Sequence, residues 1–71
     1  MLVTYWNVQA AIERMGGVIN PGISWNSAIF PSYDSAADFE HYCRTNHVEC
    51  RSVWTVGPQH PLTGKHVVVY R

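Results

Sequence analysis

A helix that turns directly into a strand is predicted for residues 35–56, where the spacing of apolar positions changes once. The helix begins at Ser35-Ala36-Ala37-Asp38, which has the form of a capping box with the serine as cap. One helical face then carries side chains three to four residues apart, at Ala36, Phe39, Cys43 and His47. We expect Asn46 to end this helix in a left-handed conformation.

Beyond the helix the apolar period becomes two, which indicates a strand. Its inward face is predicted to carry Val48, Cys50, Trp54 and Val56. Two residues break the alternation, since Ser52 falls on the inward face and Val53 on the outward face.

The N-terminal part is predicted to be a helix over 5–15. Tyr5, Val8, Ile12 and Met15 recur at helical spacing, and Gly16-Gly17 ends the pattern. A short strand over 2–6, with the helix beginning after Asn7, is the alternative.

The middle of the chain is the least regular part. The turn signal Asn20-Pro21-Gly22 predicts a small hairpin between Val18-Ile19 and Ile23-Ser24-Trp25. The apolar run 27–30 stops at Pro31, which favours an edge strand or a loop.

A C-terminal hairpin completes the expected fold. Residues 57–64 hold two Gly and two Pro and predict a long loop, after which His66–Tyr70 reads as a strand pairing antiparallel with 49–56. The prediction is a single α+β domain over 1–71, with two helices packed on a small antiparallel sheet in the order helix, short strand or loop, helix, strand, strand. The predicted core residues are Val8, Ile12, Met15, Ile29, Phe30, Phe39, Cys43, Trp54, Val56, Val67 and Val69.

Amino-acid composition and charge disfavour several classes of function but do not identify one. The 71 residues are 46% hydrophobic and 13% aromatic, which suits a packed core, and their formal net charge is zero. No basic stripe typical of nucleic-acid binders is visible, and there is no membrane-span-length apolar run or signal-peptide pattern. We therefore expect a cytoplasmic protein with reduced thiols.

His41, Cys43, His47 and Cys50 form the one cluster of residues with ligand chemistry. Cys43, His47 and Cys50 are weak zinc candidates, because their spacing matches no common zinc motif. A Cys43–Cys50 disulfide is conceivable, but two buried thiols are the simpler expectation. Nothing orients Cys43 and His47 as a nucleophile and base, so we expect no enzymatic activity, no catalytic residue and no cofactor.

The sequence best fits a small protein–protein interaction module. Its size class includes phage or mobile-element inhibitors of host complexes, anti-CRISPR proteins among them, although this analogy rests on size alone. The candidate contact residues are the aromatics without a clear core position and residues of the long loop: Trp6, Trp25, Tyr33, His60, Leu62 and Tyr70. The alternatives are a single-stranded nucleic-acid binder, with bases stacked on Trp54 and Tyr70, and a small structural-metal domain. A homodimer through the C-terminal strand also stays open.

Overall fold

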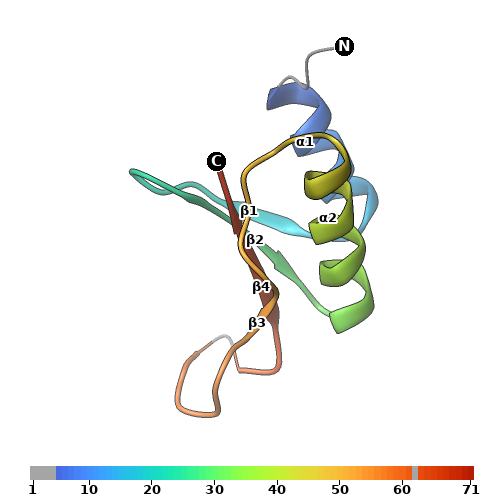
Figure 1. The fold of residues 1–71 in the computed structure, drawn as a ribbon. Helices are drawn as coiled ribbons and strands as arrows, with labels where there is room; N and C mark the ends of the chain where they lie inside the picture. Colours follow the sequence, from blue (N-terminus) through green and yellow to red (C-terminus); the bar gives the residue numbers. More distant parts are fainter. Residues whose placement is uncertain (1–4, 62) are drawn as a thin grey trace.

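Two helices pack on one face of a four-stranded antiparallel sheet, which confirms the predicted α+β class (Figure 1). The computed structural model describes the backbone of residues 5–61 and 63–71, and the side chains from residue 8 onward within these ranges. The elements are α1 (Tyr5–Arg14), β1 (Val18–Asn20), β2 (Asn26–Phe30), α2 (Tyr33–Thr45), β3 (Trp54–Thr55) and β4 (His66–Tyr70). The sheet order is β1-β2-β4-β3.

The core lies between the helices and the inner sheet face. Because side chains alternate along a strand, Ala28 and Phe30 of β2 point to the same face as Val68 and Tyr70 of β4. The buried cluster joins these to residues of both helices: Val8, Ile12, Ala36, Phe39 and Cys43. Five predicted core residues belong to this cluster: Val8, Ile12, Phe30, Phe39 and Cys43. Val56 and Val67 are buried outside it, while Met15, Ile29 and Val69 are only partly buried.

The helix α1 ends as its two glycines predicted, but each glycine has its own role. Gly16 is left-handed, with φ of 79°, and its amide donates to the carbonyl of Glu13. The Gly17 amide donates to the carbonyl of Ile12, which completes a Schellman ending. The helix begins by Tyr5, so the alternative start after Asn7 is wrong, while residues 1–4 lie outside the described ranges.

The helix α2 begins earlier than the capping box at Ser35 predicted. Ser32 is the N-cap, and its hydroxyl accepts from the Ser35 amide at 3.2 Å. A serine three residues upstream satisfies the same geometry, so Ser35 becomes part of the first turn. At the other end, His47 is the left-handed residue, with φ of 60°, whereas Asn46 has φ of −102° and uses its side-chain amide to donate to the Tyr42 carbonyl.

Replacing His47 with glycine is expected to stabilise the protein by about 1 kcal/mol. A side chain in the left-handed region costs roughly 1–2 kcal/mol, and glycine removes that cost at the position where helices prefer it. Urea unfolding of His47→Gly measures the gain. His47→Ala keeps the strained backbone and is the control, so an equal gain in both variants would contradict this explanation.

The first hairpin uses a different partner strand from the one predicted. β1 pairs with β2 in the register Val18 to Ile29, and residues 21–25 form the connection, so Ile23-Ser24-Trp25 is not the second strand. β2 lies between β1 and β4, which corrects the prediction of an edge strand or loop. Pro31 follows the last residue of β2, so its missing amide costs no ladder hydrogen bond.

A β-bulge in the strand segment 50–55 overturns the prediction that Trp54 is in the core. Cys50 is opposite Tyr70 and Trp54 is opposite Val67. The three residues between Cys50 and Trp54 therefore face only two residues of β4, between Val67 and Tyr70. The extra residue reverses the alternation. Val53 packs towards the core cluster and its amide donates to Glu40 of α2, while Trp54 turns outward and is 58% exposed.

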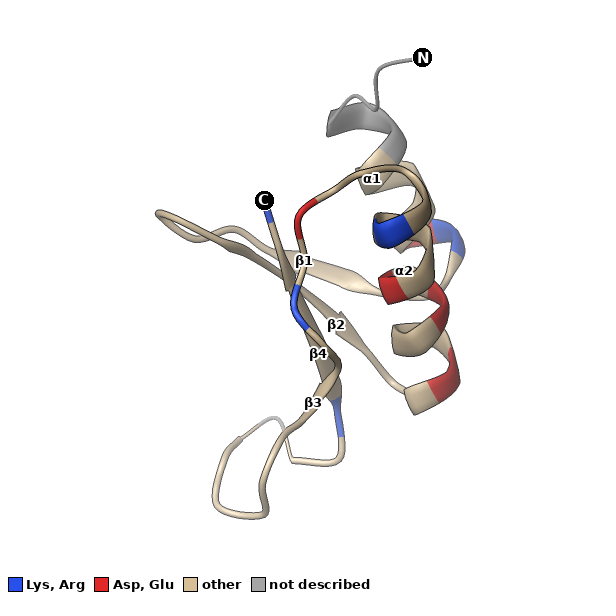
Figure 2. Cartoon of the chain, viewed as in Figure 1, with Lys and Arg blue, Asp and Glu red and all other residues tan. Residues whose placement is uncertain are grey.

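The free edges of the sheet are β1 and β3, because β4 has a strand on each side. The ladder edge of β4 is thus not available for the homodimer pairing considered from the sequence. The two layers differ in their excess charge (Figure 2). The helices hold four of the five acidic residues and two basic ones, Arg14 and Arg44. The other three basic residues, Arg51, Lys65 and Arg71, lie in or beside the β3–β4 hairpin. Within the described ranges, no helix is both long and apolar enough to cross a membrane.

Candidate functional site

The sheet face opposite the helices, here called the open face, carries an apolar row that crosses all four strands. The strand register places its members directly opposite one another, in the order Val18, Ile29, Val67 and Trp54. The two ends are exposed, Val18 at 65% and Trp54 at 58%, while Val67 between them is buried. An unbroken line of apolar side chains with an exposed tryptophan at one end is typical of a contact surface.

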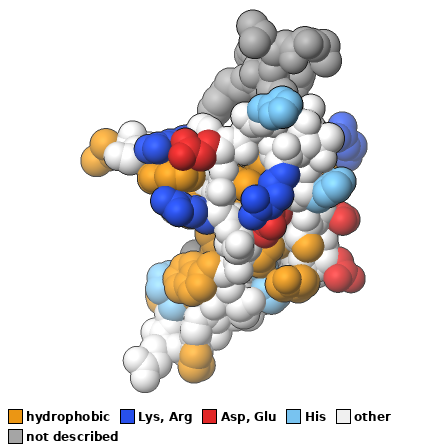
Figure 3. All heavy atoms as spheres, viewed as in Figure 1, with side chains coloured by type: hydrophobic (Ala, Val, Ile, Leu, Met, Phe, Trp, Pro, Cys, Tyr) orange, Lys and Arg blue, Asp and Glu red, His pale blue; other side chains and the backbone are white. Residues whose placement is uncertain are grey.

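Beside the apolar row, the open face becomes polar and basic. The ring of Trp25 lies under two guanidinium groups, with Arg71 at 4.3 Å and Arg51 at 5.2 Å from the ring centroid. We call Trp25, Arg51, Arg71 and Glu49 the arginine–tryptophan cluster. Hydrophobic and basic side chains lie next to each other on the sheet side of the molecule in Figure 3.

Backbone bonds hold this cluster in line with the apolar row. The Arg51 amide donates to the Val69 carbonyl, and the Arg71 amide donates to the Glu49 carbonyl. Val69, the strand neighbour of Arg51, is two residues from Val67. Arg51 therefore lies about 7 Å along the strand direction from the apolar row. The open face therefore presents apolar and cationic groups at a fixed spacing.

Within the cluster, Glu49 is tied to Arg71. The Arg71 Nε donates to one carboxylate oxygen at 2.7 Å and Nη2 donates to the other at 3.3 Å. This bond lowers the pKa of the Glu49 carboxyl below its usual value and raises the pKa of Arg71. The pair remains ionised as the pH falls, until the lowered pKa of Glu49 is reached.

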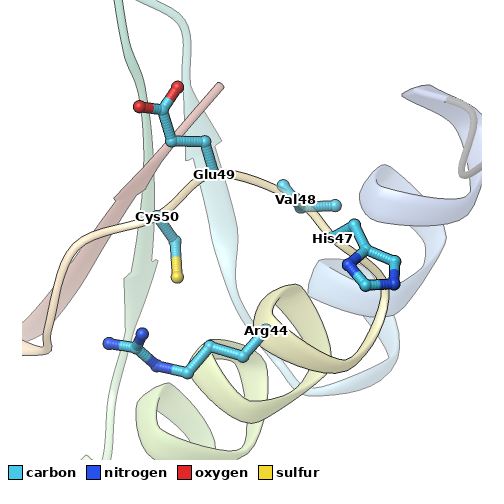
Figure 4. A pocket seen from close by; sticks show the side chains of 5 residues that line it. All are labelled: Arg44, His47, Val48, Glu49 and Cys50. Carbon is cyan, nitrogen blue, oxygen red and sulfur yellow. The ribbon is translucent and has the colours of Figure 1, made fainter.

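The metal-ligand candidates do not assemble into a site. Figure 4 shows the hollow lined by Arg44, His47, Val48, Glu49 and Cys50. The Cys50 thiol extends towards the Arg44 side chain, while His47 lies at the other end of the hollow, beyond Val48. Among the side chains that the structure describes, no three His, Cys, Asp or Glu residues gather closely enough to hold a metal ion.

The two cysteines are free thiols with different surroundings. Cys43 is buried in the core cluster and Cys50 is partly buried against it. Burial, with a smaller effect of the neighbouring Cys50 thiol, raises the pKa of Cys43 to about 12. Cys43 is therefore protonated near neutral pH, which does not suit a nucleophile.

We expect the Cys50 thiol to react with an aromatic disulfide reagent at pH 8 and the Cys43 thiol to react only on unfolding. The folded pKa of Cys43 is raised from 9.0, so its stabilising effect is complete below about pH 9 and is lost as the pH rises towards 12. Single variants Cys50→Ala and Cys43→Ala separate the two thiols. Fast labelling of native Cys50→Ala protein would contradict the buried state of Cys43.

The comparisons with known proteins are negative. No family model, no curated protein and no solved structure matches this chain. We therefore infer the function from the geometry of the open face.

The contact residues predicted from the sequence are spread over the molecule. Trp25 lies in the arginine–tryptophan cluster, as described above. Tyr33 is 57% exposed, but it lies at the start of α2 and its ring meets His66 edge-on at 5.9 Å. His60 is exposed in the long loop, whereas Tyr70 is buried, with its ring edge-on to Phe39. The side chains of Trp6 and Leu62 lie outside the described residues.

The apolar row and Arg51 were not among the contact residues predicted from the sequence. The signal that was present is the break in alternation at Ser52 and Val53, which marks the bulge that turns Trp54 outward. The approach of two arginines to Trp25 had no sequence signal, because residues 25, 51 and 71 meet only through the strand pairing.

Proposed function

We propose that this protein acts by binding another protein through the open face, without catalysing a reaction. The observation that carries the proposal is the apolar row of the open face, which is exposed at both its ends, Val18 and Trp54. Tryptophan and arginine are residue types that dominate binding energy at protein interfaces. Here Trp54 shares the open face with Arg51, whose guanidinium lies over the Trp25 ring. The apolar row beside a polar, charged cluster matches the apolar centre and polar rim of such interfaces.

The same proposal includes a cellular compartment and a class of partner. The two free thiols fit a reducing compartment such as the cytoplasm. The size class of phage and mobile-element inhibitors suggests a host complex as one class of partner, an idea that rests on chain length alone.

Affinity capture from the native host, compared across two matched variants, tests the proposal. Trp54 and Tyr33 are equally exposed, at 58% and 57%, but only Trp54 lies on the open face. We expect Trp54→Ala to abolish capture of a stoichiometric partner, because a tryptophan that becomes buried at an interface contributes about 2 kcal/mol or more. Tyr33→Ala should leave capture intact. Capture that depends on Tyr33 and not on Trp54, or no stoichiometric partner for the native sequence, would contradict the proposal.

A further inference from the structure

The arginine–tryptophan cluster gives the open face a positive character that the net charge hides. Arg51, Lys65 and Arg71 belong to the β3–β4 hairpin and its flanks, where Glu49 is the one acidic residue in the sequence from 48 to 71. The four acidic residues of the helices lie in the other layer. The chain is neutral as a whole, but its two layers carry opposite excess charge.

Arg51 and Arg71 are in different states of hydrogen bonding. Arg71 uses Nε and Nη2 on the Glu49 carboxylate. Among the described residues, no carboxylate lies within salt-bridge distance of Arg51, although its guanidinium is held 5.2 Å from the Trp25 centroid. A guanidinium stacked on a ring keeps its N–H groups at the edge, where they can donate to a carboxylate in a fork.

We propose that the partner presents a carboxylate next to an apolar side chain, and that Arg51 binds the carboxylate while the apolar row binds the neighbour. This inference rests on the proposed function and names the chemistry of its partner. The two features lie one row apart on the sheet, so an extended acidic segment with carboxylate and apolar residues two positions apart matches the spacing of about 7 Å. Face-to-face contact with a second copy is disfavoured, since it would oppose two basic clusters.

A random peptide library displayed on a surface, selected on immobilised protein, tests this chemistry directly. We expect selected peptides to be enriched in Asp or Glu two positions from an apolar residue, and their binding to be lost in Trp54→Ala. Arg51→Glu should weaken acidic peptides by about tenfold or more and should select basic peptides instead, because it places like charges together. Arg14→Glu is the matched control, since Arg14 is exposed at the end of α1, away from the open face.

The outcomes separate the two levels of proposal. Peptides that depend on Trp54 but show no acidic enrichment, or that bind Arg51→Glu equally well, would overturn the inference and leave the proposed function intact. A library that yields no Trp54-dependent peptide would count against the proposed function and the inference together. Retardation of a single-stranded oligonucleotide that is lost in Trp54→Ala would overturn both, by identifying nucleic acid as the partner.

Discussion

Phe39→Ala is expected to destabilise the protein by about 3–5 kcal/mol, the range for removing a buried phenylalanine ring. Phe39 is fully buried, and its ring centroid lies 5.5 Å from that of Phe30 and 5.4 Å from that of Tyr70. It therefore joins α2 to both central strands. A chain of 71 residues is expected to have a free energy of unfolding of roughly 4–10 kcal/mol, so the loss is at least a large part of the total.

Urea unfolding followed by tryptophan fluorescence and far-ultraviolet circular dichroism measures this effect. Asp38→Ala, the preceding residue on the exposed side of α2, is the control and should change stability by no more than about 0.5 kcal/mol. A loss below about 1.5 kcal/mol in Phe39→Ala would show that the described core is not the one that holds the fold.

Gly17→Ala is expected to destabilise the protein by about 1–3 kcal/mol, the range for overpacking a filled core. A methyl group at Gly17 would lie 2.5 Å from Cε1 of Phe30 and 2.8 Å from Cγ2 of Ile12, which are both fully buried. Neither side chain is free to move aside. The backbone of Gly17 is not left-handed, so the cost comes from lack of space and not from φ.

Gly57→Ala is expected to change the free energy of unfolding in the opposite direction, which makes Gly57 a matched control. Its backbone is also not left-handed, and an added methyl group would meet nothing within 4 Å. Gly57→Ala should therefore stabilise by about 0.4–1 kcal/mol, by restricting the unfolded chain. Thermal unfolding of the two variants gives both values, and similar shifts of the same sign would contradict the described contact at Gly17.

Local signals predicted the helices and the last strand, whereas the strand order depended on contacts that the sequence does not display. The helical spacing from Tyr5 to Met15 and the run of Val67, Val68 and Val69 are local, and both predictions are confirmed in type and position. The turn residues Asn20-Pro21-Gly22 favoured a tight hairpin, but pairing with β4 draws 26–30 into the centre of the sheet and leaves 21–25 as its connection. Long-range pairing therefore decided between two locally acceptable hairpins.

The candidate site was less predictable than the fold, for a physical reason. Strict alternation assigned Trp54 to the core, and one additional residue in the strand moved it to the opposite face. The irregular pair Ser52 and Val53 showed where the pattern failed but not in which direction the following residues would point. Trp25 was identified as a contact residue, while its arginine neighbours required the register of β4 to be known.

The position of β4 has a consequence for how the chain folds during synthesis. β4 is the last element along the described chain, yet β2 and β3 both pair with it and not with each other. Until residues 66–70 have left the ribosome, residues 26–30 have no strand on that side and Trp54 has no strand with which to pair. The four-stranded sheet therefore cannot be completed before β4 has emerged, and the nascent chain must remain soluble until then.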